Sequence, residues 1–114
     1  MEKYSVCEMT DLVVDAINEK SCYRGGGFVI SDNIDLDDCQ QFTVEFLAYE
    51  YLWVSIEYNN GKVSPCIEGG KYPILLKDYI ADWSDIDLRK WLNDLDVEIR
   101  LRIPEKYLGT KGWE

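Results

Sequence analysis

Apolar and polar residues alternate most regularly between residues 42 and 67, and this pattern predicts antiparallel strands. The alternation runs through 42–49 and again through 52–58, with the period of two that is typical of a β-strand. Asn59-Asn60-Gly61 follows, and Asn-Gly favours the positive φ angles of a type I′ turn. We therefore predict a tight hairpin that returns the chain along 62–67.

Two stretches have the spacing of amphipathic helices. The first is expected to begin at Thr10 as N-cap and to end before the glycines at 25–27, which we interpret as a flexible connector. Its apolar positions are Leu12, Val13, Ala16 and Ile17. The second and clearer helix is expected to begin at Ser84, with aspartates in its first turn. Its apolar stripe consists of Leu88, Trp91, Leu92 and Leu95.

Shorter patterns predict the remaining elements. Residues 28–30 read as a short strand, followed by an acidic loop over 31–38. Residues 74–80 fit a strand or a short helix, and helix or irregular structure is favoured. Residues 97–103 alternate between apolar and charged side chains and predict another strand. Pro65 predicts a strand end or a sheet edge, where a partner strand could pair, because proline cannot donate to a strand ladder.

The last segment, 105–113, is expected to be a short tail with a helical turn ended by Gly109 and with Trp113 packed on the body.

The chain has 114 residues, close to the commonest domain size, and we expect a single globular domain over 1–114. The order of elements predicts the α+β class. We expect an antiparallel sheet of about four to six strands, with two main helices mostly on one face.

The charge of the chain narrows its possible partners. Twelve basic residues against twenty-two acidic ones give a net charge of −10. Such a charge repels nucleic acids and anionic membranes and attracts basic proteins. The N-terminus lacks the basic start and apolar run of a secretory signal, and no segment approaches the roughly 20 apolar residues of a membrane span. We expect a soluble, cytoplasmic protein.

Catalytic, cofactor and metal motifs are not found in the sequence, so we expect a protein that is not an enzyme and needs no cofactor or metal. Histidine is absent, which removes the usual general base and zinc ligand. The glycines at 25–27 lack the pattern of a P-loop, and 33–44 lacks the glycine and glutamate of a calcium loop. The four cysteines are too widely spaced for a metal knuckle, and we interpret them as small buried thiols; two disulfides are the alternative for a secreted domain. They are Cys7, Cys22, Cys39 and Cys66.

Acidic clusters and aromatic residues are the candidate partner-binding residues. The first cluster consists of Asp32, Asp35, Asp37 and Asp38, and the second of Asp78, Asp82, Asp85 and Asp87. The aromatic candidates are Tyr51 and Trp53, expected together with Tyr49 on the sheet face opposite Val54 and Ile56, and Trp83 inside the second cluster. Carboxylates would steer a cationic partner, and the aromatic side chains would anchor it. The simpler interpretation is that the acids are solvated or cap a helix.

A small, strongly acidic domain without an export signal or catalytic motif resembles the immunity proteins of bacterial polymorphic toxin systems, including contact-dependent inhibition. The resemblance implies binding to a cognate toxin, often a basic nuclease, and blockage of its active site. One alternative is an acidic phage or mobile-element protein that mimics DNA. Another is a small enzyme that uses Asp82 with Asp85 or Asp87 as acid and base, which would need an apolar pocket to raise one pKa.

Overall fold

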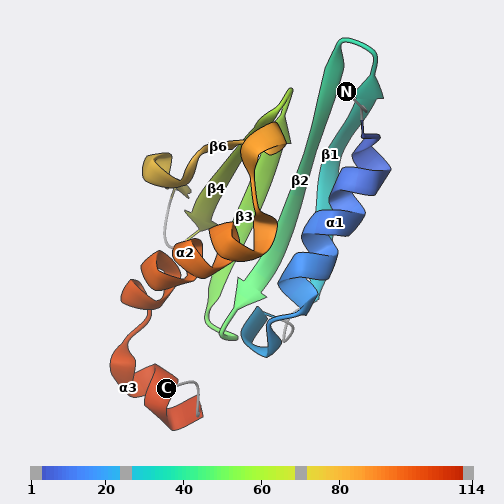
Figure 1. Ribbon diagram of the computed structural model, residues 1–114. Coiled ribbons are helices and arrows are strands. Elements are labelled where there is room, and N and C mark those ends of the chain that lie inside the picture. Colours follow the sequence, from blue (N-terminus) through green and yellow to red (C-terminus); the bar gives the residue numbers. More distant parts are fainter. Residues whose placement is uncertain (1–3, 24–26, 69–71, 112–114) are drawn as a thin grey trace.

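The computed structural model describes residues 4–23, 27–68 and 72–111 (Figure 1). Over these residues the chain forms a six-stranded antiparallel sheet in the order β1-β2-β3-β4-β5, with β6 also paired to β4. The strands are β1 (Phe28–Leu36), β2 (Cys39–Ala48), β3 (Leu52–Asn59), β4 (Lys62–Glu68), β5 (Ile74–Leu75) and β6 (Ala81–Asp82). The helices are α1 (Val6–Asn18), α2 (Leu88–Leu101) and α3 (Glu105–Lys111), with 3-10 turns η1 (Ser21–Tyr23), η2 (Lys77–Tyr79) and η3 (Trp83–Asp85).

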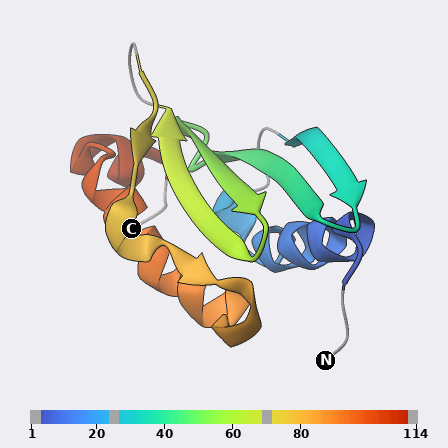
Figure 2. The same ribbon diagram turned by 90° about the horizontal axis from the view of Figure 1, so that it is seen from above.

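Both long helices lie on the same face of the sheet, as the α+β prediction required (Figure 2). The even-numbered residues of β2 and β3 point to this face and are buried, because α1 and α2 cover them. The most deeply buried side chains of the two helices are Met9, Val13 and Ile17 from α1 and Leu92, Leu95 and Ile99 from α2. Among the described residues no helix covers the opposite face of the sheet.

The central hairpin has the predicted form. Asn60 and Gly61 have φ values of 43° and 97°, so both central residues of the β3–β4 turn take the left-handed conformation that Asn-Gly favours. The β2–β3 turn also has positive φ at both central residues, 57° at Tyr49 and 56° at Glu50. Bulky residues rarely adopt that conformation, so the sequence does not predict it. Tyr49 is therefore a buried turn residue, and its predicted place on the exposed sheet face is wrong.

The first helix begins earlier than predicted. Ser5 is the N-cap, and its hydroxyl and the Glu8 carboxylate form a reciprocal capping box. Thr10 is buried inside the helix, and its hydroxyl donates to the carbonyl of Val6. With this start, Leu12 lies at the margin of the buried stripe and is 43% exposed.

The strand predicted over 97–103 is wrong, because the second helix continues to Leu101. Asp87 caps α2 in place of Ser84, which belongs to η3. Ile99 and Ile103 extend the buried stripe of Leu95 at intervals of four residues, whereas Val97 and Leu101 are 62% and 76% exposed. A half-buried strand would have placed all four on one face. Gly109 lies within α3 and does not end it, and Trp113 lies outside the described residues.

The predicted acidic loop is largely a strand. β1 runs to Leu36, and a register shift between Ser31 and Ile34 accommodates its polar residues at the edge of the sheet. Only the last two aspartates of the cluster, Asp37 and Asp38, form the turn. The connector predicted at 25–27 lies outside the described residues except for Gly27, whose φ is 72°.

Pro65 does not mark an open edge. β4 pairs with β5 through 66–67 and with β6 through 62–63, so Pro65 lies in the interruption between them, where its missing N–H is not needed. Its carbonyl accepts a hydrogen bond from the amide of Leu76 at 3.0 Å. Residues 74–80 accordingly combine a short strand with a 3-10 turn.

The four cysteines are all free thiols, and they differ in exposure. Cys66 is buried, Cys22 and Cys39 are half-buried, and Cys7 is exposed. The prediction of four buried thiols is therefore wrong for Cys7, which lies on the solvent side of α1.

Candidate partner-binding groove

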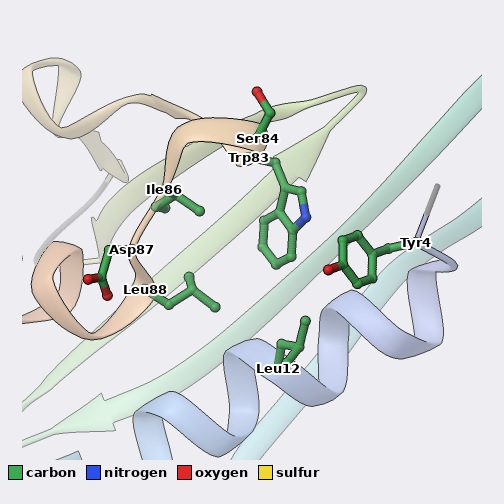
Figure 3. Close-up of a pocket in the computed structure, with 7 residues that line it drawn as sticks. All are labelled: Tyr4, Leu12, Trp83, Ser84, Ile86, Asp87 and Leu88. Carbon is green, nitrogen blue, oxygen red and sulfur yellow. The ribbon is translucent and has the colours of Figure 1, made fainter. Parts of the chain in front are cut away.

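A groove of about 710 Å³ lies between α1 and the segment that leads into α2 (Figure 3). The two walls come from opposite halves of the chain. The lining residues are Tyr4, Leu12, Trp83, Ser84, Ile86, Asp87 and Leu88. Most of them are aromatic or aliphatic, so the groove is a concave surface able to desolvate an apolar side chain.

Trp83 is held in place by contacts on two sides. Its backbone N–H donates to the carbonyl of Gly61 at 2.8 Å, which ties η3 to the β3–β4 turn. Its ring packs edge-on against Tyr58, with centroids 5.8 Å apart, and against Tyr4, with centroids 6.3 Å apart. The indole is therefore a half-buried, fixed wall of the groove, facing Tyr4 in Figure 3.

Leu12 contributes an exposed apolar side chain to the opposite wall. Glu8 and Asp15 lie one turn before and one turn after Leu12 on the solvent side of α1, and Asp11 lies beside them. Glu8 is engaged in the capping box. The carboxylates of Asp11 and Asp15 form no hydrogen bond or ion pair with the residues that the structure describes.

The second wall also carries carboxylates, with different local partners. Asp82 pairs with Lys62 at 2.5 Å on the exposed surface, and Asp87 accepts a hydrogen bond from the backbone N–H of Lys90 as the cap of α2. Asp85 lies between two lining residues and has no such partner in the described part of the chain. Among these acids, Asp87 is the one that lines the groove itself.

The first acidic cluster meets this groove at the Tyr4 end. The Asp35 carboxylate accepts hydrogen bonds from the backbone N–H of Val6, at 3.1 Å, and from the Gln40 side chain, at 3.0 Å. The same Gln40 amide donates to the carbonyl of Tyr4 at 2.9 Å. A carboxylate at a helix N-terminus also interacts favourably with the helix dipole. Asp35 therefore positions α1 and Tyr4, and this role differs from the predicted partner contact.

Asp37 and Asp38 lie in the exposed β1–β2 turn. They border a shallow depression that also contains Tyr58 and Gly61, both of which touch Trp83. Two hydrogen bonds join the β1–β2 and β3–β4 turns there. The backbone N–H of Gln40 donates to the side-chain oxygen of Asn60 at 2.8 Å, and the backbone N–H of Asn60 donates to the carbonyl of Gln40 at 2.9 Å. The fold therefore brings the turn acids of the first cluster and part of the second to the same end of the sheet. The side chain of Asp32 lies outside the described residues.

Three predicted site residues lie elsewhere. Tyr51 packs on Tyr107 of α3, with ring centroids 4.7 Å apart. Trp53 lies on the helix-free face, where its cross-strand neighbours are Leu47 and Glu68. Asp78 belongs to η2 and borders a separate depression with Glu98 and Arg102. These residues do not line the groove.

Sequence reasoning missed Tyr4 and Leu12 as site residues. The signal that could have found them is the Ser5-x-x-Glu8 capping box, which starts α1 five residues before the predicted cap at Thr10. With the earlier start, Val6 and Met9 join the buried stripe of α1, and Leu12 lies at the margin of that stripe and not at its centre.

A second group of aromatic and acidic residues is hydrogen-bonded within the fold. The hydroxyls of Tyr23 and Tyr49 both donate to the half-buried carboxylate of Asp96. Burial and these hydrogen bonds raise the pKa of both tyrosines well above the ordinary value of 10. The guanidinium of Arg100 lies 5.9 Å from the centre of the Tyr49 ring. This cluster ties α2 to η1 and to the β2–β3 turn, and we interpret it as structural.

Comparison with known proteins identifies no relative. No family model, curated protein or solved structure matches the chain. The described residues contain no group of three or more acidic or cysteine side chains placed to hold a metal ion. None of their helices combines the length and apolar character needed to cross a membrane.

Proposed function

We propose that this protein is a non-catalytic binding protein that neutralises a basic partner. The partner we propose is a toxin nuclease domain whose cationic active site is covered, as an immunity protein would cover it in the bacterial cytoplasm. The observation that carries the proposal is the groove lined by Tyr4, Leu12, Trp83 and Leu88 together with the acidic residue Asp87.

The physical reason lies in the chemistry of phosphate binding. A nuclease binds its substrate through Arg and Lys side chains, and carboxylates at a protein surface can pair with the same groups. The net charge of −10 would accelerate association with such a partner at low salt. Trp83 and Tyr4 would supply the desolvated anchors that carry most of the binding energy in protein interfaces.

The test begins with capture of the partner from the native host on the tagged protein at low salt, followed by elution with a salt step. The captured protein is then purified and assayed for toxicity and nuclease activity. A basic nuclease that this protein inhibits at a one-to-one ratio supports the proposal. A captured protein that retains full activity in the complex would contradict it.

Two triple variants with the same change of charge test the site. Replacing Asp82, Trp83 and Asp85 with alanine should weaken binding about 100-fold, because an aromatic anchor and two carboxylates are lost. The matched control replaces Glu57, Trp53 and Glu68 with alanine and should change affinity less than about threefold, since these residues lie on the sheet face. Thermal melting of both variants separates lost binding from lost folding. Equal losses in the two variants would show that overall charge, and not the groove, governs binding.

A further inference from the structure

The two edges of the sheet differ in length. At one edge lie β5 and β6, each of two residues, and both pair with β4. At the other lies β1, nine residues long, which pairs with β2 alone among the described residues (Figure 2). In an antiparallel strand every second residue turns its backbone N–H and C=O groups away from the neighbouring strand, so β1 presents donors and acceptors on its outer side. The long open edge is therefore β1, and not the segment around Pro65.

The register shift in β1 gathers apolar side chains on one face of this edge. Val29, Ile34 and Leu36 all lie opposite odd-numbered residues of β2. Residues directly opposite each other in an antiparallel pair share a face, so these three point away from the helices. They are 48%, 37% and 60% exposed. Without the shift, Ile34 and Leu36 would share the helix-covered face with Ile30.

Backbone groups and apolar side chains together suit an extended occupant. A segment added as a further strand would pair its own backbone with β1 and lay alternate side chains over Val29, Ile34 and Leu36. A helix satisfies its backbone hydrogen bonds internally, so it could cover these side chains but could not pair with the edge. The edge therefore favours a strand.

The charge beside β1 selects the kind of strand. Asp37 and Asp38 directly follow Leu36 in the β1–β2 turn and are exposed, whereas 28–31 carries no charged side chain. A segment that is apolar along β1 and has lysines or arginines beside the turn matches this distribution. A second copy of this chain matches it less well, because each copy has a net charge of −10 and pairing would bring the two charges together.

The same turn connects the edge with the groove. Asp37 and Asp38 border the depression that contains Tyr58, and the Tyr58 ring contacts Trp83. A basic partner that covers the groove would therefore reach the end of β1 across this depression.

We propose that the basic partner pairs an extended segment with the outer edge of β1, with apolar side chains over Val29, Ile34 and Leu36 and cations beside Asp37 and Asp38. The pairing is antiparallel, as in the rest of the sheet, because antiparallel ladders are the more stable. In this direction the cations precede the apolar residues in the partner's sequence. This inference rests on the proposed function, since it gives the same basic partner a second contact.

Two peptides of identical composition test the charge and the direction. Each is about eight residues long. One has two lysines followed by alternating threonine and valine, and the other carries the two lysines at its C-terminal end. The first should bind about five- to tenfold more tightly and should slow the hydrogen exchange of backbone amides within 28–36, measured by NMR. Equal affinity of the two peptides, or protection confined to other segments, would overturn the inference.

Methylation of alternate backbone nitrogens in the first peptide tests the strand ladder. The two alternate sets lie on opposite edges of an extended peptide, and only one edge can face β1. One methylated peptide should lose affinity at least about tenfold, because its donors to β1 are removed, whereas the other should bind as the parent does. Equal affinities of the two methylated peptides would show that the peptide does not bind as a strand.

A pair of single variants tests the edge with the captured partner. Val29→Lys should weaken binding about tenfold, because it removes an apolar contact and sets a cation against the basic segment. Val97→Lys makes the same change on the exposed side of α2, where Val97 is 62% exposed, and should have less than about a twofold effect. Both side chains are exposed, so both variants should fold, which thermal melting checks.

Two results with these variants would overturn the inference. One is equal affinity of Val29→Lys and Val97→Lys for the captured partner. The other is a dimer of the free protein, seen by analytical ultracentrifugation, that Val29→Lys dissociates, because the edge would then belong to a second copy.

The same experiments separate this inference from the proposed function. If a captured nuclease is inhibited by the Val29→Lys variant as by the parent and is not displaced by the first peptide, the edge inference is wrong and the inhibitor function stands. If the first peptide pairs with β1 but no basic protein is inhibited, the edge contact stands and the inhibitor function fails.

Discussion

The groove and the Asp96 cluster combine the same residue types with opposite results. In the cluster, the Asp96 carboxylate accepts hydrogen bonds from two buried tyrosines, Tyr23 and Tyr49, and these three residues come from three different parts of the fold. In the groove, Tyr4 and Trp83 face an open space, and Asp85 has no partner among the described residues. One site is complete within the chain, and the other presents its groups to the outside.

The difference shows how a strongly acidic chain divides its carboxylates between stability and recognition. A buried carboxylate must be hydrogen-bonded, because leaving its desolvated oxygens unpaired is costly. An exposed carboxylate keeps its hydration and loses it only when a cationic partner arrives. Asp96 is half-buried and belongs to the first kind, and the exposed Asp35 is likewise engaged in hydrogen bonds within the fold. Asp11, Asp15 and Asp85 have the character of the second kind.

The largest expected effect is on stability, from Asp96→Ala. This change leaves two buried tyrosine hydroxyls without their acceptor and should lower the free energy of unfolding by about 3 kcal/mol. Asp94→Ala, an exposed position on the same helix, is the control and should stay within about 0.5 kcal/mol of the parent. Urea unfolding measures both. A similar, small effect of the two changes would mean that the cluster does not stabilise the fold.

The second prediction concerns alkaline pH. The folded protein keeps the protons of Tyr23 and Tyr49 above pH 10, whereas the unfolded chain releases them there, because the pKa values are raised only in the fold. Stability is therefore highest below pH 10 and falls as the pH rises beyond it, by about 1–3 kcal/mol between pH 9 and pH 11. Urea unfolding at several pH values tests this. The Tyr23→Phe/Tyr49→Phe variant should lose most of the slope, and an unchanged slope would assign it to other groups.

The smallest expected effect is on binding, from the α1 side of the groove. Asp11→Asn with Asp15→Asn should weaken binding of the captured partner about three- to tenfold at low salt and less at high salt, because exposed ion pairs are weak and screened. Glu57→Gln with Asp94→Asn removes the same charge elsewhere and should have less than a twofold effect at low salt. Calorimetry at two salt concentrations measures both variants. Equal losses would remove α1 from the binding site.

Local signals explain which parts of the fold could be predicted. The β3–β4 hairpin follows from Asn60-Gly61 and from alternation over neighbouring strands, so no distant contact is needed to specify it. The segment 97–103 is ambiguous locally, because alternation over seven residues also contains the i, i+4 pairs of a helix. Burial of Ile99 and Ile103 beside Leu95 decides for the helix, and that burial depends on packing.

The candidate site, like the segment 97–103, could be predicted only in part from local sequence patterns. The sequence marks Asp82, Trp83, Asp85 and Asp87 as one cluster because they are close together in the chain. Of these, Trp83 and Asp87 line the groove, whereas Asp82 pairs with Lys62. Trp53 and Asp78 satisfied the same criteria of composition and lie elsewhere. Composition identifies residues capable of recognition, but only their arrangement shows which of them share a surface.

From the sequence alone came the net charge of −10, the hairpin, the α+β class and the acidic surroundings of Trp83, because composition and turn chemistry are local properties. The tertiary structure decided that Tyr4 and Leu12 stand opposite Trp83, and that Asp35 and Asp96 are engaged within the fold. These pairings join residues far apart in the chain. They depend on how α1 and α2 pack on the sheet, which no local pattern encodes.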